Sequence, residues 1–139
     1  MTPTGAILAQ VRSALAALAS QPVIFETFAE VIAAESPRSL VIGPGQQETF
    51  EAETHTSGFI YGMRRFPVRV VCTAWTREEA ETLRFEVEDA LAAWATAAPY
   101  PADFLPASFT DQGGGQSGSE RIYFSTVLDL AVFYQRSAP

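Results

Sequence analysis

The side chains that most often act as nucleophile, general base or metal ligand are scarce in this chain. It has one histidine, His55, and one cysteine, Cys72. A Ser–His–Asp triad would have to be built on His55, which lies in a polar stretch away from any nucleophile motif. Metal sites need several ligands at fixed spacing, and one histidine and one cysteine on different elements do not supply them. We therefore expect neither a catalytic residue nor a bound metal.

Two glycine-rich segments, residues 43–45 and 113–115, could be mistaken for phosphate-binding loops. A Walker-type loop needs a lysine, and the chain contains none. The acidic run over residues 78–89 could supply paired catalytic carboxylates. A solvated helix face explains it better, because acids in the first turn interact favourably with the helix dipole. These features predict a protein that is not an enzyme and that binds no cofactor.

All nine basic residues are arginines, and the only basic cluster is formed by Arg64, Arg65 and Arg69. Two interpretations of this arginine cluster have equal weight. Arginines on a strand can bind the carboxylates of a partner through bidentate hydrogen bonds. They can equally protect the edge of a sheet against aggregation.

Size and charge narrow the class of protein. The chain has 139 residues, a hydrophobic fraction of 47% and a formal net charge of −7 at pH 7. This length predicts one domain over residues 1–139 with a substantial core. The acidic balance argues against a free-standing nucleic-acid binder, which needs a basic surface. No apolar run approaches the roughly 18 residues that span a bilayer, and the chain does not begin with a basic signal-peptide segment, so we expect a cytoplasmic protein.

A strand that leads directly into a helix is the clearest structural signal. Residues 64–75 alternate between an apolar face and a mixed face, which predicts a strand with one buried side. Thr76 and Glu79 form a capping box that starts a helix over residues 77–97. The apolar stripe of the helix should pack on the apolar face of the strand. The stripe consists of Leu83, Val87, Leu91 and Trp94, and the strand face of Phe66, Val68, Val70 and Cys72.

Weaker patterns predict the remaining elements. They are a helix over residues 4–19 with Thr4 as its N-cap, a short apolar run at 23–25, a helical turn or two at 28–34, strands at 39–42 and 104–110, a glycine-rich hairpin tip at 111–119, and a long final strand from Ile122 past Tyr134.

The expected fold is α+β, in the order α–β–β–α–β–β, with a mostly antiparallel sheet and two helices packed on one face. The second face of the sheet would then be apolar and uncovered. It would carry Val71, Trp75, Val127, Ala131 and Phe133. Exposed apolar patches of more than a few hundred Å² usually mark an association surface.

Two short motifs carry a resemblance to a known family. Residues 40–43 read Leu-Val-Ile-Gly, and residues 68–77 form a strand that ends in Trp-Thr-Arg. With the order of elements, these motifs resemble the tail terminator (tail completion) proteins of long-tailed bacteriophages and their counterparts in phage-derived gene transfer particles. The resemblance covers most of the chain. The Ala/Glu-rich segment 25–37 departs from the family, where a proline-containing extended stretch is more common.

This resemblance implies a structural virion protein located in the tail or neck and assembled in the host cytoplasm. It implies a homohexameric ring that caps the tail tube, ends tube polymerisation and joins the tail to the head connector or stopper protein. DNA would pass through the lumen without specific binding, which suits an acidic chain because like charges repel. No contact with a membrane is implied.

The candidate interface residues lie on the arm over residues 46–62 and on the strand after it. Aromatic anchors in polar surroundings are typical of interfaces, so we expect the arm to order against a neighbouring subunit or the tail tube. The candidates are Phe50, Phe59, Ile60, Tyr61, Arg64, Arg65, Arg69, Trp75 and Phe133.

Two other classes of function remain open. One is another head–tail joining protein, such as a stopper or neck protein, or a tube-like virion subunit. The other is a cytoplasmic α+β domain that binds a small ligand or acts as an enzyme. A ring seen by negative-stain microscopy would separate the virion proteins from this last class.

Overall fold

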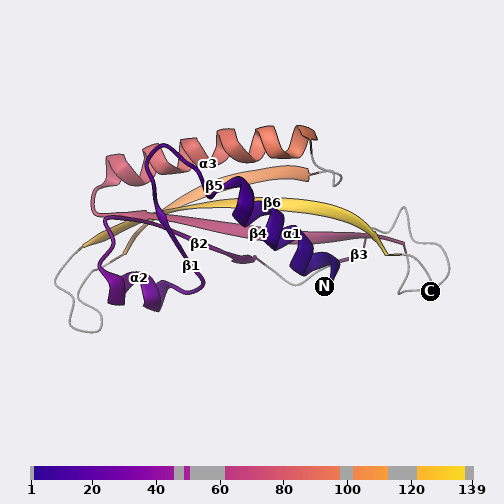
Figure 1. Cartoon of the computed structure of the whole chain (residues 1–139), viewed down its shortest axis with the longest axis horizontal. Coiled ribbons are helices and arrows are strands. Elements are labelled where there is room, and N and C mark those ends of the chain that lie inside the picture. Colours follow the sequence, from indigo (N-terminus) through magenta and orange to yellow (C-terminus); the bar gives the residue numbers. More distant parts are fainter. Residues whose placement is uncertain (1, 46–48, 51–61, 98–101, 113–121, 137–139) are drawn as a thin grey trace.

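The computed structural model describes residues 2–45, 49–50, 62–97, 102–112 and 122–136 (Figure 1). Within these residues the fold is α+β and contains three helices and six strands. In chain order they are α1 (Pro3–Ala14), β1 (Val23–Phe25), α2 (Phe28–Ala34), β2 (Arg38–Pro44), β3 (Thr49–Phe50), β4 (Gly62–Ala74), α3 (Arg77–Ala97), β5 (Ala102–Gln112) and β6 (Tyr123–Arg136).

The six strands form one mixed sheet. Its main order is β1-β2-β4-β6-β5, and β3 also pairs with β4. The β1–β2 pair is parallel and the other pairs are antiparallel. The central pair, β4 and β6, keeps one register from Gly62 opposite Arg136 to Ala74 opposite Phe124.

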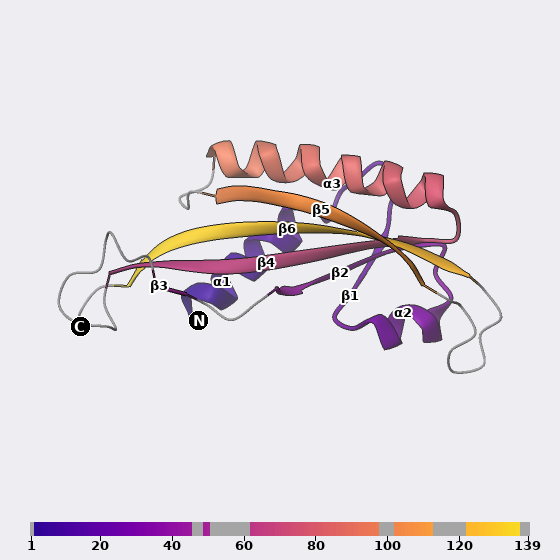
Figure 2. The same ribbon diagram turned by 180° about the vertical axis from the view of Figure 1, so that it is seen from behind.

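The central strands run beyond their neighbours at one end. β2 pairs with β4 only as far as Val68, and β5 pairs with β6 only as far as Val132. Residues 62–65 of β4 and 133–136 of β6 therefore form a narrow ribbon, here called the strand extension. β3 borders one side of it, and it points away from the helices (Figures 1 and 2).

Helices α1 and α3 cover one face of the sheet, and their apolar stripes meet the alternating residues of the central strands. The predicted packing of the α3 stripe on β4 is confirmed. The buried cluster comprises Ile7, Val11, Leu15, Leu40, Ile42, Phe66, Val68, Val70, Cys72, Leu83, Val87, Leu91, Leu128, Leu130, Val132 and Tyr134, with Trp94 packed against it.

The bounds predicted for the first helix were wrong at both ends. Thr2, not Thr4, is the N-cap, and its hydroxyl accepts a hydrogen bond from the backbone N–H of Gly5 at 3.1 Å. Pro3 takes the first helical position, where a missing N–H costs nothing. The helix ends at Ala14 rather than Ala19, and a turn follows it.

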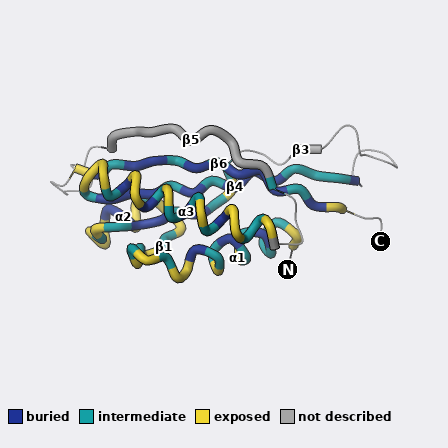
Figure 3. Tube along the Cα trace, turned by 90° about the horizontal axis from the view of Figure 1, so that it is seen from above, coloured by how far each residue is buried: buried dark blue, intermediate teal, exposed yellow. Residues whose placement is uncertain are grey.

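The predicted order α–β–β–α–β–β was also wrong, because a third helix, α2, packs on the opposite face of the sheet (Figures 1 and 3). The hydroxyl of Thr27 caps it by accepting from the N–H of Glu30 at 3.3 Å. The helical turns predicted at residues 28–34 are present as α2, but the predicted order left them out because seven residues with two buried anchors, Val31 and Ile32, give only a weak helical period. These anchors form a small second core with Tyr123, joined by Phe25, Phe28, Val41 and Trp75.

Glu86 of α3 binds the turn that follows α1 through hydrogen bonds to Ser20. Its carboxylate accepts hydrogen bonds from the backbone N–H of Ser20, at 3.0 Å, and from the Ser20 hydroxyl. On the other side, Arg38 of β2 donates to the carbonyl oxygen of Ser20 at 2.9 Å. Three elements that are distant in sequence are thereby joined at one residue.

Glu86→Ala is therefore expected to lower the free energy of unfolding by about 1.5–3 kcal/mol, because charged hydrogen bonds are lost and Ser20 keeps an unpaired N–H. Urea unfolding followed by circular dichroism measures the change. Glu81→Ala on the exposed side of the same helix is the control and should shift stability by less than about 0.5 kcal/mol. Equal effects of the two substitutions would contradict the role of Glu86.

Candidate interaction surfaces

The strand extension contains three of the predicted interface residues, Arg64, Arg65 and Phe133, and β3 beside it contains a fourth, Phe50. Arg65 pairs across the sheet with Phe133 on one side and with Thr49 of β3 on the other. Phe50 of β3 is opposite Arg64. The alternation of the strands places Arg65 and Phe133 on the same face of the ribbon as Met63, and all three are partly exposed.

The rest of the predicted arm and the hairpin tip cannot be placed in this way. Phe59, Ile60 and Tyr61 lie outside the described residues, as do His55 and residues 113–119 of the tip. Of the arm, the structure describes residues 49–50 and Gly62. The expectation that the arm orders against a neighbour stays a prediction.

Arg69 has an internal partner. Its Nε donates to Asp129 Oδ1 at 2.8 Å, and its Nη2 donates to Asp129 Oδ2 at 3.2 Å, which is a bidentate ion pair between β4 and β6. This hydrogen bonding raises the pKa of the Arg69 guanidinium. Because β4 lies between β2 and β6, Arg69 is not at a sheet edge, and edge protection does not describe it.

The second face of the sheet is less open and less apolar than the sequence suggested. Trp75 packs against the small core under α2, and Ala131 is only 2% exposed. The Arg69–Asp129 ion pair lies between the Trp75 end of this face and the Phe133 end. The expected continuous apolar patch is therefore divided, and only Phe133 belongs to the strand extension.

A row of buried hydroxyls crosses the sheet on the α2 side. Ser39, Thr73 and Ser125 are neighbours on β2, β4 and β6, and each is no more than 1% exposed. The hydroxyls of Thr73 and Ser125 are 2.9 Å apart and share a hydrogen bond. Within the described part of the chain, no hydrogen-bond partner reaches Ser39 Oγ or Tyr123 Oη. Nothing in the local sequence pattern marks this row.

The outer face of α3 is a surface that the sequence interpretation missed. Phe85 is 55% exposed, and the Arg84 guanidinium lies 4.8 Å from the centre of its ring. Arg84 also donates to the Glu88 carboxylate at 3.2 Å. The sequence did contain a sign of this surface, because Phe85 is an aromatic residue outside the apolar stripe of an acidic helix.

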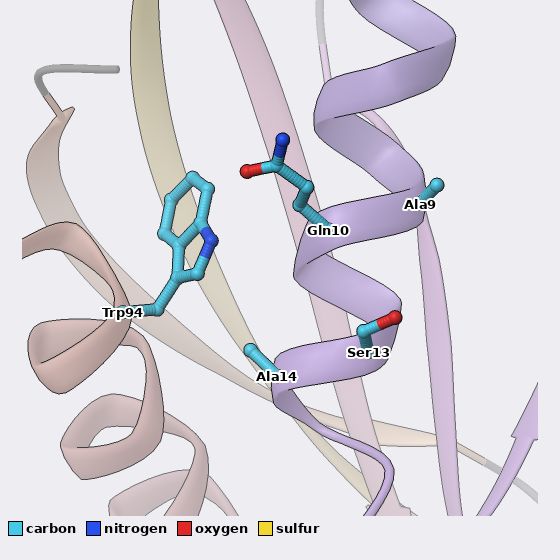
Figure 4. A pocket seen from close by; sticks show the side chains of 5 residues that line it. All are labelled: Ala9, Gln10, Ser13, Ala14 and Trp94. Atoms are coloured by element: carbon cyan, nitrogen blue, oxygen red, sulfur yellow. The ribbon is translucent and has the colours of Figure 1, made fainter. Parts of the chain in front are cut away.

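A shallow groove lies between α1 and α3. It is lined by Ala9, Gln10, Ser13, Ala14 and Trp94 (Figure 4). Three of these side chains are small, Trp94 is aromatic and Gln10 is a neutral amide, so none of them carries a charge. The groove therefore offers shape but no acid–base pair or metal ligands.

Reactive chemistry is equally sparse in the described regions. No group of three or more histidine, cysteine, aspartate or glutamate side chains among these residues could hold a metal ion. Burial raises the pKa of the Cys72 thiol to about 12, so the thiolate needed for nucleophilic attack hardly forms. The described helices include none whose length and apolar content would suit a membrane crossing.

No model of a known protein family matches this chain, and no curated protein matches it. A proposal for its function therefore rests on the sequence motifs and on the surfaces described above.

Proposed function

We propose that the chain is a subunit of a ring that caps a phage tail tube, ends tube polymerisation and joins the tail to the head, as tail terminator proteins do. The observation that carries the proposal is the strand extension. At one end of the molecule it presents arginine and apolar side chains that are at least partly exposed, among them Met63, Arg65 and Phe133, and these suit contact rather than chemistry.

The sequence motifs support the same role. The Trp-Thr-Arg motif, residues 75–77, lies where β4 passes into α3. Thr76 caps the helix there, accepting from the N–H of Glu79 at 3.2 Å. Trp75 packs toward α2 on the opposite face. The motif therefore contacts the helices on both faces of the central sheet, α3 on one face and α2 on the other, which suits a rigid structural subunit.

In this proposal the partners are five further copies in a homohexamer, the tail tube protein, and the head–tail connector or stopper protein. The chain acts without enzymatic activity, cofactor or metal. DNA passes through the lumen of the ring, and a net charge of −7 keeps the ring from retaining it. The protein is part of the virion, in the tail or neck, after assembly in the host cytoplasm.

Reconstruction of purified particles by electron microscopy tests the proposal. The expected result is one six-fold ring of this chain at the head-proximal end of the tail tube, and unjoined heads and tails when the chain is deleted. A single copy of the chain per particle, or a closed ring with another number of copies, would contradict the proposal. Density for the chain at the position of the stopper protein or along the tube would also contradict it.

A further inference from the structure

The charged side chains are distributed unevenly along the molecule. α3 begins where β4 ends, whereas the strand extension contains the first residues of β4, about 40 Å away along the strand. Figure 1 shows the first turns of α3 and the strand extension at opposite ends of the long axis. The exposed carboxylates of Glu78 and Glu81 lie toward the first of these ends, beside Arg77, whereas the charged residues described in the extension are all arginines, including Arg65 and the exposed Arg136.

The surface on α3 has the composition of a contact site. Phe85 projects from the helix, and the Arg84 guanidinium lies over its ring, where the attraction between cation and ring is favourable. The exposed residues Glu78, Glu81 and Asp89 surround it at helical spacing. An aromatic side chain within a charged rim is typical of the residues that dominate binding energy at interfaces.

The strand extension has the complementary composition. Met63 and Phe133 provide apolar surface on one face of the ribbon, and Arg65 lies directly beside Phe133. β5 ends its pairing before this point, so the outer side of residues 133–136 has no described strand beside it. An apolar surface next to an arginine matches an aromatic side chain next to carboxylates.

We propose that the outer face of α3 in one copy docks on the strand extension of a second copy, with Phe85 against Met63 and Phe133. Glu81 then pairs with Arg65. The number of copies in the assembly, six, rests on the proposed function. The contact between two copies does not depend on it. The two surfaces are different, one on α3 and the other at the far ends of β4 and β6, so each copy uses both, and the contact is head-to-tail.

Disulfide trapping tests the contact in the full-length protein. Thr82→Cys and Gln135→Cys place thiols beside the two surfaces, at exposed positions. Oxidation of a mixture of the two variants should give a covalent dimer, whereas each variant alone should not. The buried Cys72 does not compete. Thr82→Cys mixed with Glu26→Cys, an exposed position beside α2, is the control pair, and equal trapping of that pair would overturn the proposal.

Charge exchange tests the pairing. In sedimentation equilibrium, Phe85→Ala and Arg65→Glu should each weaken self-association about thirtyfold, the effect of losing a residue central to an interface. The double variant Glu81→Arg/Arg65→Glu should regain association. Glu26→Arg/Arg65→Glu has the same net charge and should not. Circular dichroism confirms that each variant is folded. The proposed pairing would be overturned if both double variants regained association, or if neither of them did.

The outcomes also separate this contact from the proposed function. Unchanged self-association of Phe85→Ala, together with a six-fold ring in particles that carry it, overturns the contact and leaves the function standing. A charge exchange that restores a closed assembly of another order supports the contact and contradicts the function. Trapping of Thr82→Cys or Gln135→Cys by another virion protein, and never by a second copy, overturns the contact.

Discussion

Leu91→Ala is expected to lower the free energy of unfolding by about 2–5 kcal/mol, the range for truncating a fully buried leucine. Leu91 is 0% exposed and belongs to the core between α3 and the sheet. The loss includes a cavity term because the long β4–β6 ladder beneath the helix resists collapse. Urea unfolding followed by circular dichroism measures the change.

The matched control for Leu91→Ala is Thr82→Ala, on the exposed side of the same helix, which should change stability by less than about 0.5 kcal/mol. An unfolding midpoint that stays unchanged in Leu91→Ala would mean that α3 packs on the sheet through a different set of residues.

Alkaline pH is expected to remove about 4 kcal/mol of stability through Cys72 alone, between pH 9 and pH 12. The thiol has a pKa near 9.0 when unfolded, and burial raises it to about 12 in the folded protein, although the hydrogen bond with Thr126 opposes this. Between these values the thiol ionises only in the unfolded state. Stability from this group is therefore complete below pH 9 and falls by about 1.4 kcal/mol for each pH unit above it.

Comparison of the wild-type chain with Cys72→Ala isolates this effect, since the other titrating groups are common to both. Urea unfolding between about pH 8 and about pH 10.5 should show a steeper loss of stability in the wild-type chain. Parallel losses in the two proteins would show that the Cys72 thiol titrates normally in the folded state.

The part of the fold that was predictable from sequence is the part with long, regular periods. The alternation of Phe66, Val68 and Val70 and the helical spacing of Leu83, Val87 and Leu91 each persist over several repeats, so both elements and their mutual packing were predicted. The helical turns at residues 28–34 were also predicted, but not the packing of α2 on the second face of the sheet, because Val31 and Ile32 are adjacent anchors in a helix of only seven residues.

The candidate surfaces were less predictable, because they depend on pairs that are distant in sequence. Arg69 and Asp129 are 60 residues apart, and only the β4–β6 register shows that they meet. Arg65 and Phe133 were both predicted as interface residues, but their position on one face of a projecting ribbon required the structure. Phe85 was overlooked because its neighbours made the helix look uniformly solvated.

The edges of the sheet bear on how the protein resists fibre formation. β1 is three residues long, which is too short to template a growing strand. In β5 the pairing with β6 shifts between Leu105 and Ser108, and Pro106 has no N–H to donate. Neither terminal strand presents a long, regular ladder to another chain. The protein can therefore reach a high concentration without cross-β growth from these edges.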